Sequence, residues 1–126
     1  MLTKRQAQLR DLQIAAKRLQ EALDMEKDDI VRDAVIQRFE FTFELTWKTI
    51  ATILRENGID FKGVKSVFRD AARIELLQEL ETWFSYLEAR NLTTHTYDLE
   101  VAEKVYIRAK EFSKDLKTLL PKLADY

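Results

Sequence analysis

Hydrophobic residues recur every three or four positions along most of the chain, which is the spacing of one face of an α-helix. The first such stripe predicts a helix over residues 3–25, with Leu9, Leu12, Ala16, Leu19 and Leu23 on its apolar face. An acidic segment follows at residues 26–29 and predicts a turn, because Asp28 or Asp29 can cap the next helix at its positive end.

The segment from residue 30 to residue 57 contains neither proline nor glycine. Residues 39–45 alternate between apolar and polar, as a half-buried strand would. A segment of 28 residues is far longer than an ordinary strand, however, and Asn57-Gly58 is typical of a left-handed helix cap. The segment is therefore predicted to be a helix, whose main stripe is Ile36, Phe39, Phe43, Thr46, Ile50 and Leu54.

Three further apolar residues of this helix, Phe41, Leu45 and Trp47, fall outside its main stripe. Apolar surface that extends around so much of a helix indicates two buried faces. One face packs inside the protomer. The second face packs against another subunit, or the helix is simply the central one of a single bundle, and the pattern allows both interpretations.

The second half of the chain predicts three more helices and no strand. Ser66 is a natural cap for a short helix over residues 67–76, a further helix covers residues 78–90, and a last long helix begins after the threonine-rich turn and stops near Pro121. Only two glycines and one proline occur, too few for many tight turns. We expect an all-α protein, an up-and-down four-helix bundle with an additional short helix, in a single domain over residues 1–126.

Composition narrows the possible functions. The 21 Lys and Arg residues nearly balance 22 Asp and Glu residues, so a net charge of −1 offers no general attraction for nucleic acid. There is no cysteine, and hence no disulfide framework and no thiolate chemistry. Neither a signal peptide nor an apolar run of membrane-spanning length is visible. We expect a cytoplasmic protein that does not enter the membrane.

Candidate chemistry is concentrated between Arg90 and Tyr97, a segment that holds the only histidine of the chain, His95. On one continuous helix Arg90 and His95 would point about 140° apart, so a shared target requires a break between them. The threonines of the segment favour such a break. In one interpretation the segment is structural, with Arg90 capping a helix end and His95 and Tyr97 serving a turn and packing.

A second interpretation is a metal-independent ribonuclease site. His95 would take a proton from the ribose 2′-hydroxyl, and Arg90 would neutralise charge on the scissile phosphate. One histidine cannot easily serve as both base and acid. A homodimer that places two motifs side by side would supply two histidines and two arginines.

The third interpretation, a metal site, is the weakest. Its ligands would be mostly carboxylates, and no recognisable spacing links them to His95; the candidates are Glu40, Glu44, Asp98 and Glu100. No phosphate-binding loop or cofactor fingerprint occurs either. We therefore expect no metal and no cofactor.

Three segments carry a resemblance to a known family: residues 38–48 (RFEFTFELTWK), residues 57–59 (NGI) and residues 90–97 (RNLTTHTY). They resemble the nucleotidyltransferase substrate-binding protein family, which belongs to the HEPN superfamily of helical bundles. The HEPN signature is an arginine, four intervening residues and a histidine, followed in this branch by any residue and a tyrosine. Arg90, His95 and Tyr97 match it without departure.

The resemblance implies a function that the residues alone do not show. Similar proteins pair with a minimal nucleotidyltransferase, often as toxin and antitoxin, and the HEPN member cleaves RNA through its arginine and histidine. This implies that Arg90 and His95 are catalytic, that Arg90 and Asn91 bind the substrate, and that the partner transfers AMP to Tyr97. The alternative implied by the family name is a non-catalytic subunit that presents a nucleotide-acceptor substrate to the nucleotidyltransferase.

Overall fold

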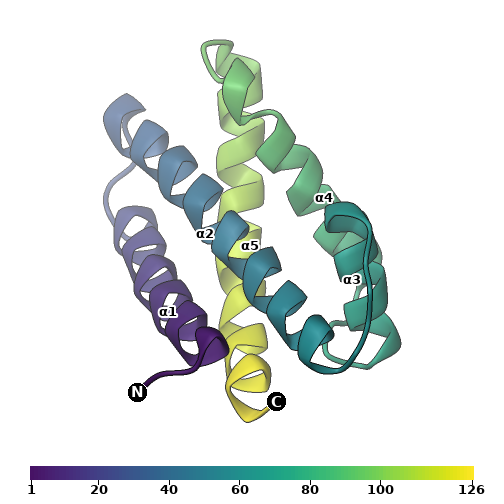
Figure 1. Cartoon of the computed structure of the whole chain (residues 1–126). Helices are drawn as coiled ribbons and strands as arrows, with labels where there is room; N and C mark the ends of the chain where they lie inside the picture. The colour runs from purple at the N-terminus through teal and green to yellow at the C-terminus, as the bar shows by residue number, and fades with distance from the viewer.

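The computed structural model describes all 126 residues and contains five α-helices, one short 3₁₀ helix and no strand (Figure 1). The four long helices alternate in direction, so that α1 and α4 run upward in Figure 1 while α2 and α5 run downward. The short α3 lies beside α4. The predicted all-α bundle of four main helices with an additional short one is confirmed; the elements are α1 (Lys4–Leu23), α2 (Asp29–Glu56), α3 (Gly63–Arg73), α4 (Leu80–Asn91), η1 (Thr93–His95) and α5 (Leu99–Asp125).

Short polar side chains define where three of the long helices begin. Thr3 and Gln6 form a reciprocal capping box at the start of α1. The predicted cap at Asp28 is confirmed, because its carboxylate accepts a hydrogen bond from the Val31 amide at 2.7 Å. Asp98 caps α5 in the same way. These caps satisfy amides that the first turn of a helix leaves without a backbone partner.

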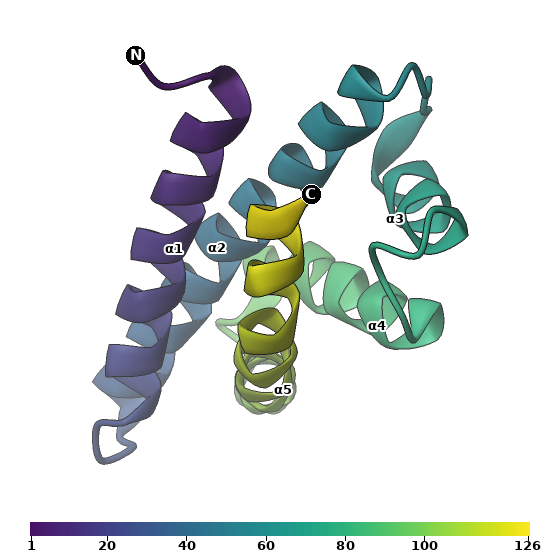
Figure 2. The ribbon, with the colours of Figure 1, turned by 90° about the horizontal axis from the view of Figure 1, so that it is seen from below.

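The predicted left-handed cap at the end of α2 is also confirmed. Gly58 has φ +72°, and its amide donates to the carbonyl of Arg55, while the Ile59 amide donates to the carbonyl of Leu54. This is the Schellman arrangement, which requires a backbone conformation that glycine adopts without strain. The chain is thereby turned out of α2 toward α3, as Figure 2 shows from below.

Two predicted helix limits are wrong. The short helix begins at Gly63, four residues before Val67, and Ser66 lies inside it; the Ser66 hydroxyl reaches back to accept from the Lys62 amide at 3.0 Å. The last helix runs through Pro121 to Asp125. Proline costs a helix one backbone hydrogen bond. Here it lies in an exposed position close to the helix end, and burial of Leu123 keeps the final turn packed.

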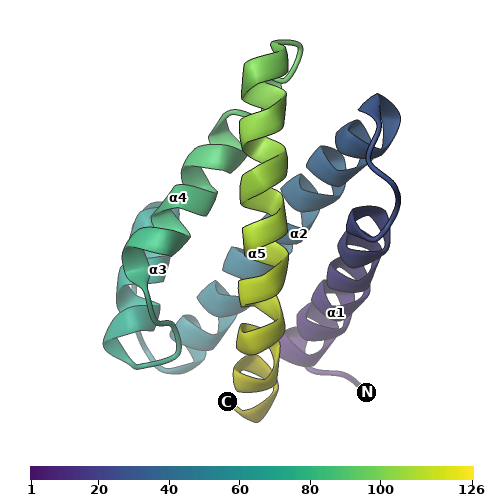
Figure 3. The same ribbon diagram turned by 180° about the vertical axis from the view of Figure 1, so that it is seen from behind.

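The core is built around α2, which packs against α1, α3, α4 and α5. Every member of its predicted stripe is buried, whereas Phe41, Leu45 and Trp47 are half-buried. Aromatic rings fill the centre of the bundle: Phe112 of α5 packs edge-on against Phe39 at 5.3 Å between ring centroids. Figure 3 shows α5 crossing in front of α2, between α1 and α4.

Two polar contacts tie α5 to its neighbours. Lys27, just before α2, forms an ion pair with Glu103 of α5, and this hydrogen bond lowers the pKa of the Glu103 carboxyl. In α4, the Tyr86 hydroxyl donates to the Asp115 carboxylate of α5. Burial, together with that acceptor, raises the pKa of the Tyr86 phenol. None of the helices is both long enough and apolar enough to cross a bilayer.

Candidate active site

The segment that holds the only histidine lies where α4 ends and α5 begins, at one end of the bundle (Figure 1). The predicted break between Arg90 and His95 is confirmed, because α4 stops at Asn91 and η1 follows. Threonine side chains stabilise the break: the Thr93 hydroxyl donates to the Arg90 carbonyl at 2.8 Å, and the Thr96 hydroxyl donates to the Thr93 carbonyl at 3.1 Å. These bonds satisfy carbonyls that the ending helix leaves free.

Arg90 points from α4 toward α2, where three groups hold its guanidinium. One terminal nitrogen, Nη1, forms an ion pair with Glu44. The Nε–H donates to the Asn91 side-chain carbonyl at 3.1 Å. The guanidinium carbon lies 5.6 Å from the centroid of the Phe43 ring. The side chain keeps 24% of its surface exposed, so the group is anchored but still accessible.

Glu44 is anchored in turn by Trp47. Its first carboxylate oxygen faces Arg90, and the second accepts a hydrogen bond from the Trp47 indole N–H at 3.0 Å. From the sequence, Glu44 was a candidate only as a remote metal ligand, and its contact with Arg90 was missed. The only signal in the sequence was an acidic residue placed among the aromatic residues of a helix that has to be buried.

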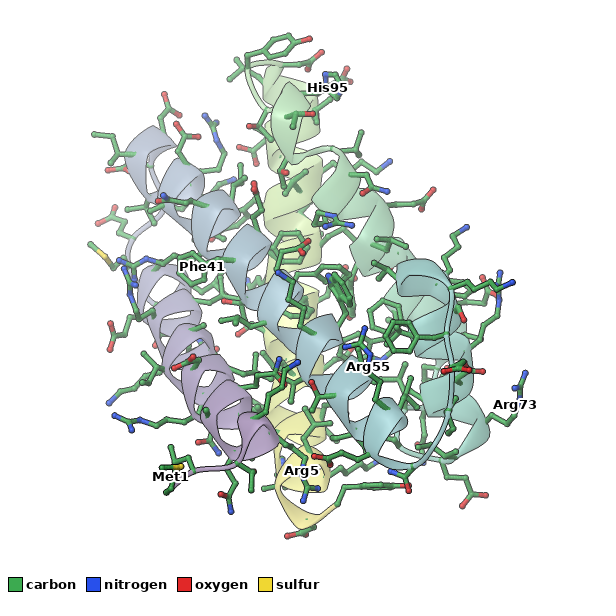
Figure 4. All side chains as sticks on the ribbon, viewed as in Figure 1. Met1, Arg5, Phe41, Arg55, Arg73 and His95 are labelled. Carbon is green, nitrogen blue, oxygen red and sulfur yellow. The ribbon has the colours of Figure 1, made fainter.

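His95 and Tyr97 lie at the exposed tip of the bundle, away from α2. Figure 4 shows His95 at the extreme end of the molecule, and its ring centroid is 6.1 Å from that of Tyr97, edge to face at 71°. Both residues are exposed, and Tyr97 retains 84% of its accessible surface. The structural interpretation of the segment expected Tyr97 to pack into the bundle. The exposure of Tyr97 shows that it does not.

The structure thus brings the predicted site residues together in two groups. Arg90 and Asn91 form one group against α2, and His95 and Tyr97 form the other at the tip. No hydrogen bond joins the Arg90 and His95 side chains within the protomer. Within one protomer the two side chains therefore have different surroundings.

An open groove of about 500 Å³ lies between α2 and the segment of Thr93 and Thr96. Three acidic side chains of α2 line it, Asp33, Glu40 and Glu44, and Thr93 and Thr96 lie on the opposite side of the lining. A carboxylate-lined groove repels a phosphate, so a polyanion is expected to approach Arg90 from outside the groove. The discounted metal ligands do not assemble: no three His, Asp or Glu side chains come together as an ion site.

The two groups supply complementary chemistry. Arginine provides a permanent, fork-shaped positive charge that suits phosphate, and histidine exchanges protons near neutral pH. Phosphodiester cleavage by a neighbouring hydroxyl needs both functions.

Comparison with known proteins agrees with the motif. Residues 7–125 match the family described as "Nucleotidyltransferase substrate binding protein like". A Haemophilus influenzae protein named "Probable ribonuclease HepT" is 35% identical over 103 residues, which cover 75% of this chain and 70% of that protein.

Two solved structures share the fold. A structure from Haemophilus influenzae, described as revealing the fold of a substrate binding domain of a nucleotidyltransferase, superposes with a TM-score of 0.83 at 30% identity, covering 92% of this chain and 98% of the other. A crystal structure from Thermus thermophilus superposes with a TM-score of 0.79 at 31% identity, covering 90% and 96% of the two chains.

Proposed function

The chain belongs to the nucleotidyltransferase substrate binding protein like family, and we propose that it is the RNA-cleaving subunit of a pair formed with a minimal nucleotidyltransferase. The observation that carries this proposal is the helix break that presents Arg90 and His95 at one end of the bundle, with His95 exposed. The relative named as a probable ribonuclease supports the same reaction class.

In the proposed reaction, neutral His95 accepts the proton of a ribose 2′-hydroxyl. The freed oxygen attacks the adjacent phosphorus, and the bond from phosphorus to the 5′-oxygen of the next nucleotide breaks. A 2′,3′-cyclic phosphate remains on one fragment, and the leaving 5′-oxygen takes up a proton. Arg90 stabilises the charge that accumulates on the phosphate oxygens in the transition state.

A second copy of the chain completes the proposed site. Within one protomer Arg90 faces α2 while His95 stands at the tip, and no contact joins them. A twofold axis near η1 would bring the exposed His95 of one protomer close to Arg90 of the other. It would also supply a second histidine as the acid for the leaving oxygen.

Tyr97 is the proposed point of control. Its exposed phenol oxygen would attack the α-phosphorus of ATP, held by the partner nucleotidyltransferase, with release of pyrophosphate and a proton to solvent. The product carries AMP on a ring whose centroid lies 6.1 Å from that of the His95 imidazole. A bulky anion at that distance would exclude the RNA phosphate and reverse the local charge. The chain would then act as a toxin that its partner silences in the cytoplasm.

The test is cleavage of a labelled oligoribonucleotide by the purified chain, without its partner, in excess EDTA. Wild type should yield fragments ending in a cyclic phosphate, identified by mass spectrometry. His95→Ala and Arg90→Ala should each abolish cleavage, whereas Thr94→Ala, an exposed neighbour with no side-chain hydrogen bond, should cleave like wild type. Circular dichroism and size-exclusion chromatography check that each variant keeps its fold and size. Wild type without activity on diverse RNAs would contradict the proposal.

One observation favours a second candidate, a non-catalytic subunit that presents a substrate to the nucleotidyltransferase. Arg90 is already paired with Glu44, which weakens its attraction for phosphate in the free protomer. This candidate gains if wild type and both variants are equally inert on RNA while the substitutions still impair nucleotide transfer by the partner enzyme.

A further inference from the structure

Glu44 of α2 contacts the candidate catalytic arginine from a different helix, and the family motif from Arg90 to Tyr97 does not include it. We propose that Glu44 is a positioning residue for Arg90: it fixes the guanidinium in the orientation that serves the transition state, at some expense in affinity for RNA. This inference rests on the proposed function. It rests equally on the ion pair between the Glu44 carboxylate and Arg90 Nη1.

The contacts around Arg90 form a continuous chain that leaves part of the guanidinium free. The Trp47 indole donates to Glu44, Glu44 pairs with Nη1, and Nε donates to Asn91. The Phe43 ring lies against the guanidinium, with its centroid 5.6 Å from the central carbon. Nη2 has no protein hydrogen-bond partner, so it remains available for a phosphate oxygen.

This anchoring matters because an arginine side chain has many rotamers. Held at Nη1 and Nε, the guanidinium does not have to be ordered when the substrate binds, and a misplacement of about 1 Å can cost about a hundredfold in rate. The Glu44 carboxylate also repels the RNA backbone, which weakens ground-state binding. A positioning carboxylate and an inhibitory counter-ion therefore predict opposite changes in kcat.

Glu40 provides a matched control. It lies one turn before Glu44 on α2 and lines the same groove, but it is exposed and contacts no arginine. Glu40→Ala and Glu44→Ala remove the same charge from nearly the same place. An effect of charge alone should therefore appear in both variants, whereas an effect of positioning should appear only in Glu44→Ala.

The experiment measures kcat and KM for cleavage of a fluorophore–quencher oligoribonucleotide, scaled to the folded fraction. For Glu44→Ala we expect kcat to fall about tenfold to a hundredfold while KM stays level or decreases. Glu40→Ala should keep the kcat of wild type. Glu44→Gln keeps one oxygen for Arg90 and should recover part of the lost kcat. An unchanged or increased kcat in Glu44→Ala would overturn the inference, and so would equal losses in the Glu40 and Glu44 variants.

A second measurement separates this inference from the proposed function. In the free protein, the Arg90 Nε–H signal in a ¹H–¹⁵N spectrum, assigned by its loss in Arg90→Lys, should be sharp in wild type and in Glu40→Ala. In Glu44→Ala it should shift and broaden by exchange with water. If wild type cleaves no RNA, the proposed function fails. An Arg90 signal that Glu44→Ala leaves unchanged would overturn the positioning role, whether or not RNA is cleaved.

Discussion

Replacement of Phe43 by leucine should damage stability and activity through two separate contacts of one ring. Phe43 is fully buried. Its ring centroid lies 6.0 Å from that of Phe39, 5.8 Å from that of Phe68 and 5.9 Å from that of Phe112. The same ring lies under the Arg90 guanidinium, whose central carbon is 5.6 Å from the ring centroid. No other aromatic residue of the core has this double role.

The expected magnitude follows from these contacts. An aromatic pair contributes about 0.5–1.5 kcal/mol beyond its buried area, and three pairs that share rings do not add fully, so Phe43→Leu should cost about 2–3 kcal/mol in free energy of unfolding. For a domain of 126 residues, total stability is on the order of 6–19 kcal/mol, so the variant stays folded. Its melting temperature should fall by about 10 °C.

Loss of the ring under Arg90 should lower kcat for RNA cleavage about tenfold per folded molecule, which corresponds to about 1.4 kcal/mol in the transition state. Phe39→Leu is the control. Phe39 is equally buried one turn earlier and packs on two rings, Phe43 and Phe112, but not on Arg90. Phe39→Leu should therefore lower the free energy of unfolding but keep the kcat of wild type. The reasoning is refuted if both variants lose kcat equally, or if Phe43→Leu keeps the kcat of wild type.

Three further substitutions test the forces that hold the bundle together. Lys27 lowers the pKa of Glu103, so this ion pair stabilises the folded state fully above the ordinary pKa of 4.5 and stops doing so as the pH falls below that value. Glu103→Gln should therefore make the free energy of unfolding depend less on pH in the acid range of a denaturation series. Tyr86→Phe removes the hydrogen bond to Asp115 and should cost about 1.5–3 kcal/mol in urea unfolding at neutral pH. Since the pKa of Tyr86 is raised above 10.0, its contribution should persist up to that pH and decline above it, and the variant should lack this alkaline decline. Gly58→Ala meets no atom within 4 Å but has to adopt φ +72°, so thermal unfolding should show a loss of about 1 kcal/mol.

Most of the fold could be predicted because the local signals in the sequence, helix caps and turn residues, agree with the pattern of residues that become buried. The apolar stripe of α2, the Asp28 cap and the turn at Gly58 each depend on residues close in sequence, and each is confirmed. The start of α3 and the passage of α5 through Pro121 were predicted wrongly. In α5, burial of Leu123 beyond the proline shows that tertiary packing outweighs the local stop signal. In α3, the first turn has no side-chain cap, so a search for cap residues misses its start.

The candidate site could be predicted only in part. The break after α4 follows from local threonine chemistry and is confirmed. The sequence predicts it as the condition for Arg90 and His95 to share a target, and that sharing stays a prediction. Arg90 of α4 and Glu44 of α2 form an ion pair although they lie 46 positions apart in the chain (90 − 44 = 46). Helical periodicity places each residue on its own helix but does not say which faces meet. That contact therefore becomes visible only in the folded protein.

The most direct test of the central claim is activity in mixed dimers of two inactive variants. Arg90→Ala and His95→Ala protomers, unfolded together and refolded at equal amounts, form mixed dimers in which one site still combines an intact Arg90 with an intact His95. If each site uses these residues from different protomers, the mixture should cleave RNA in EDTA faster than either variant alone. About a quarter of wild-type cleavage is the upper limit, because half the dimers are mixed, each has one intact pair of Arg90 and His95 out of two, and the leaving oxygen there takes its proton from water instead of from a second His95. A mixture that contains mixed dimers by native mass spectrometry, yet cleaves no faster than either variant alone, would contradict the account.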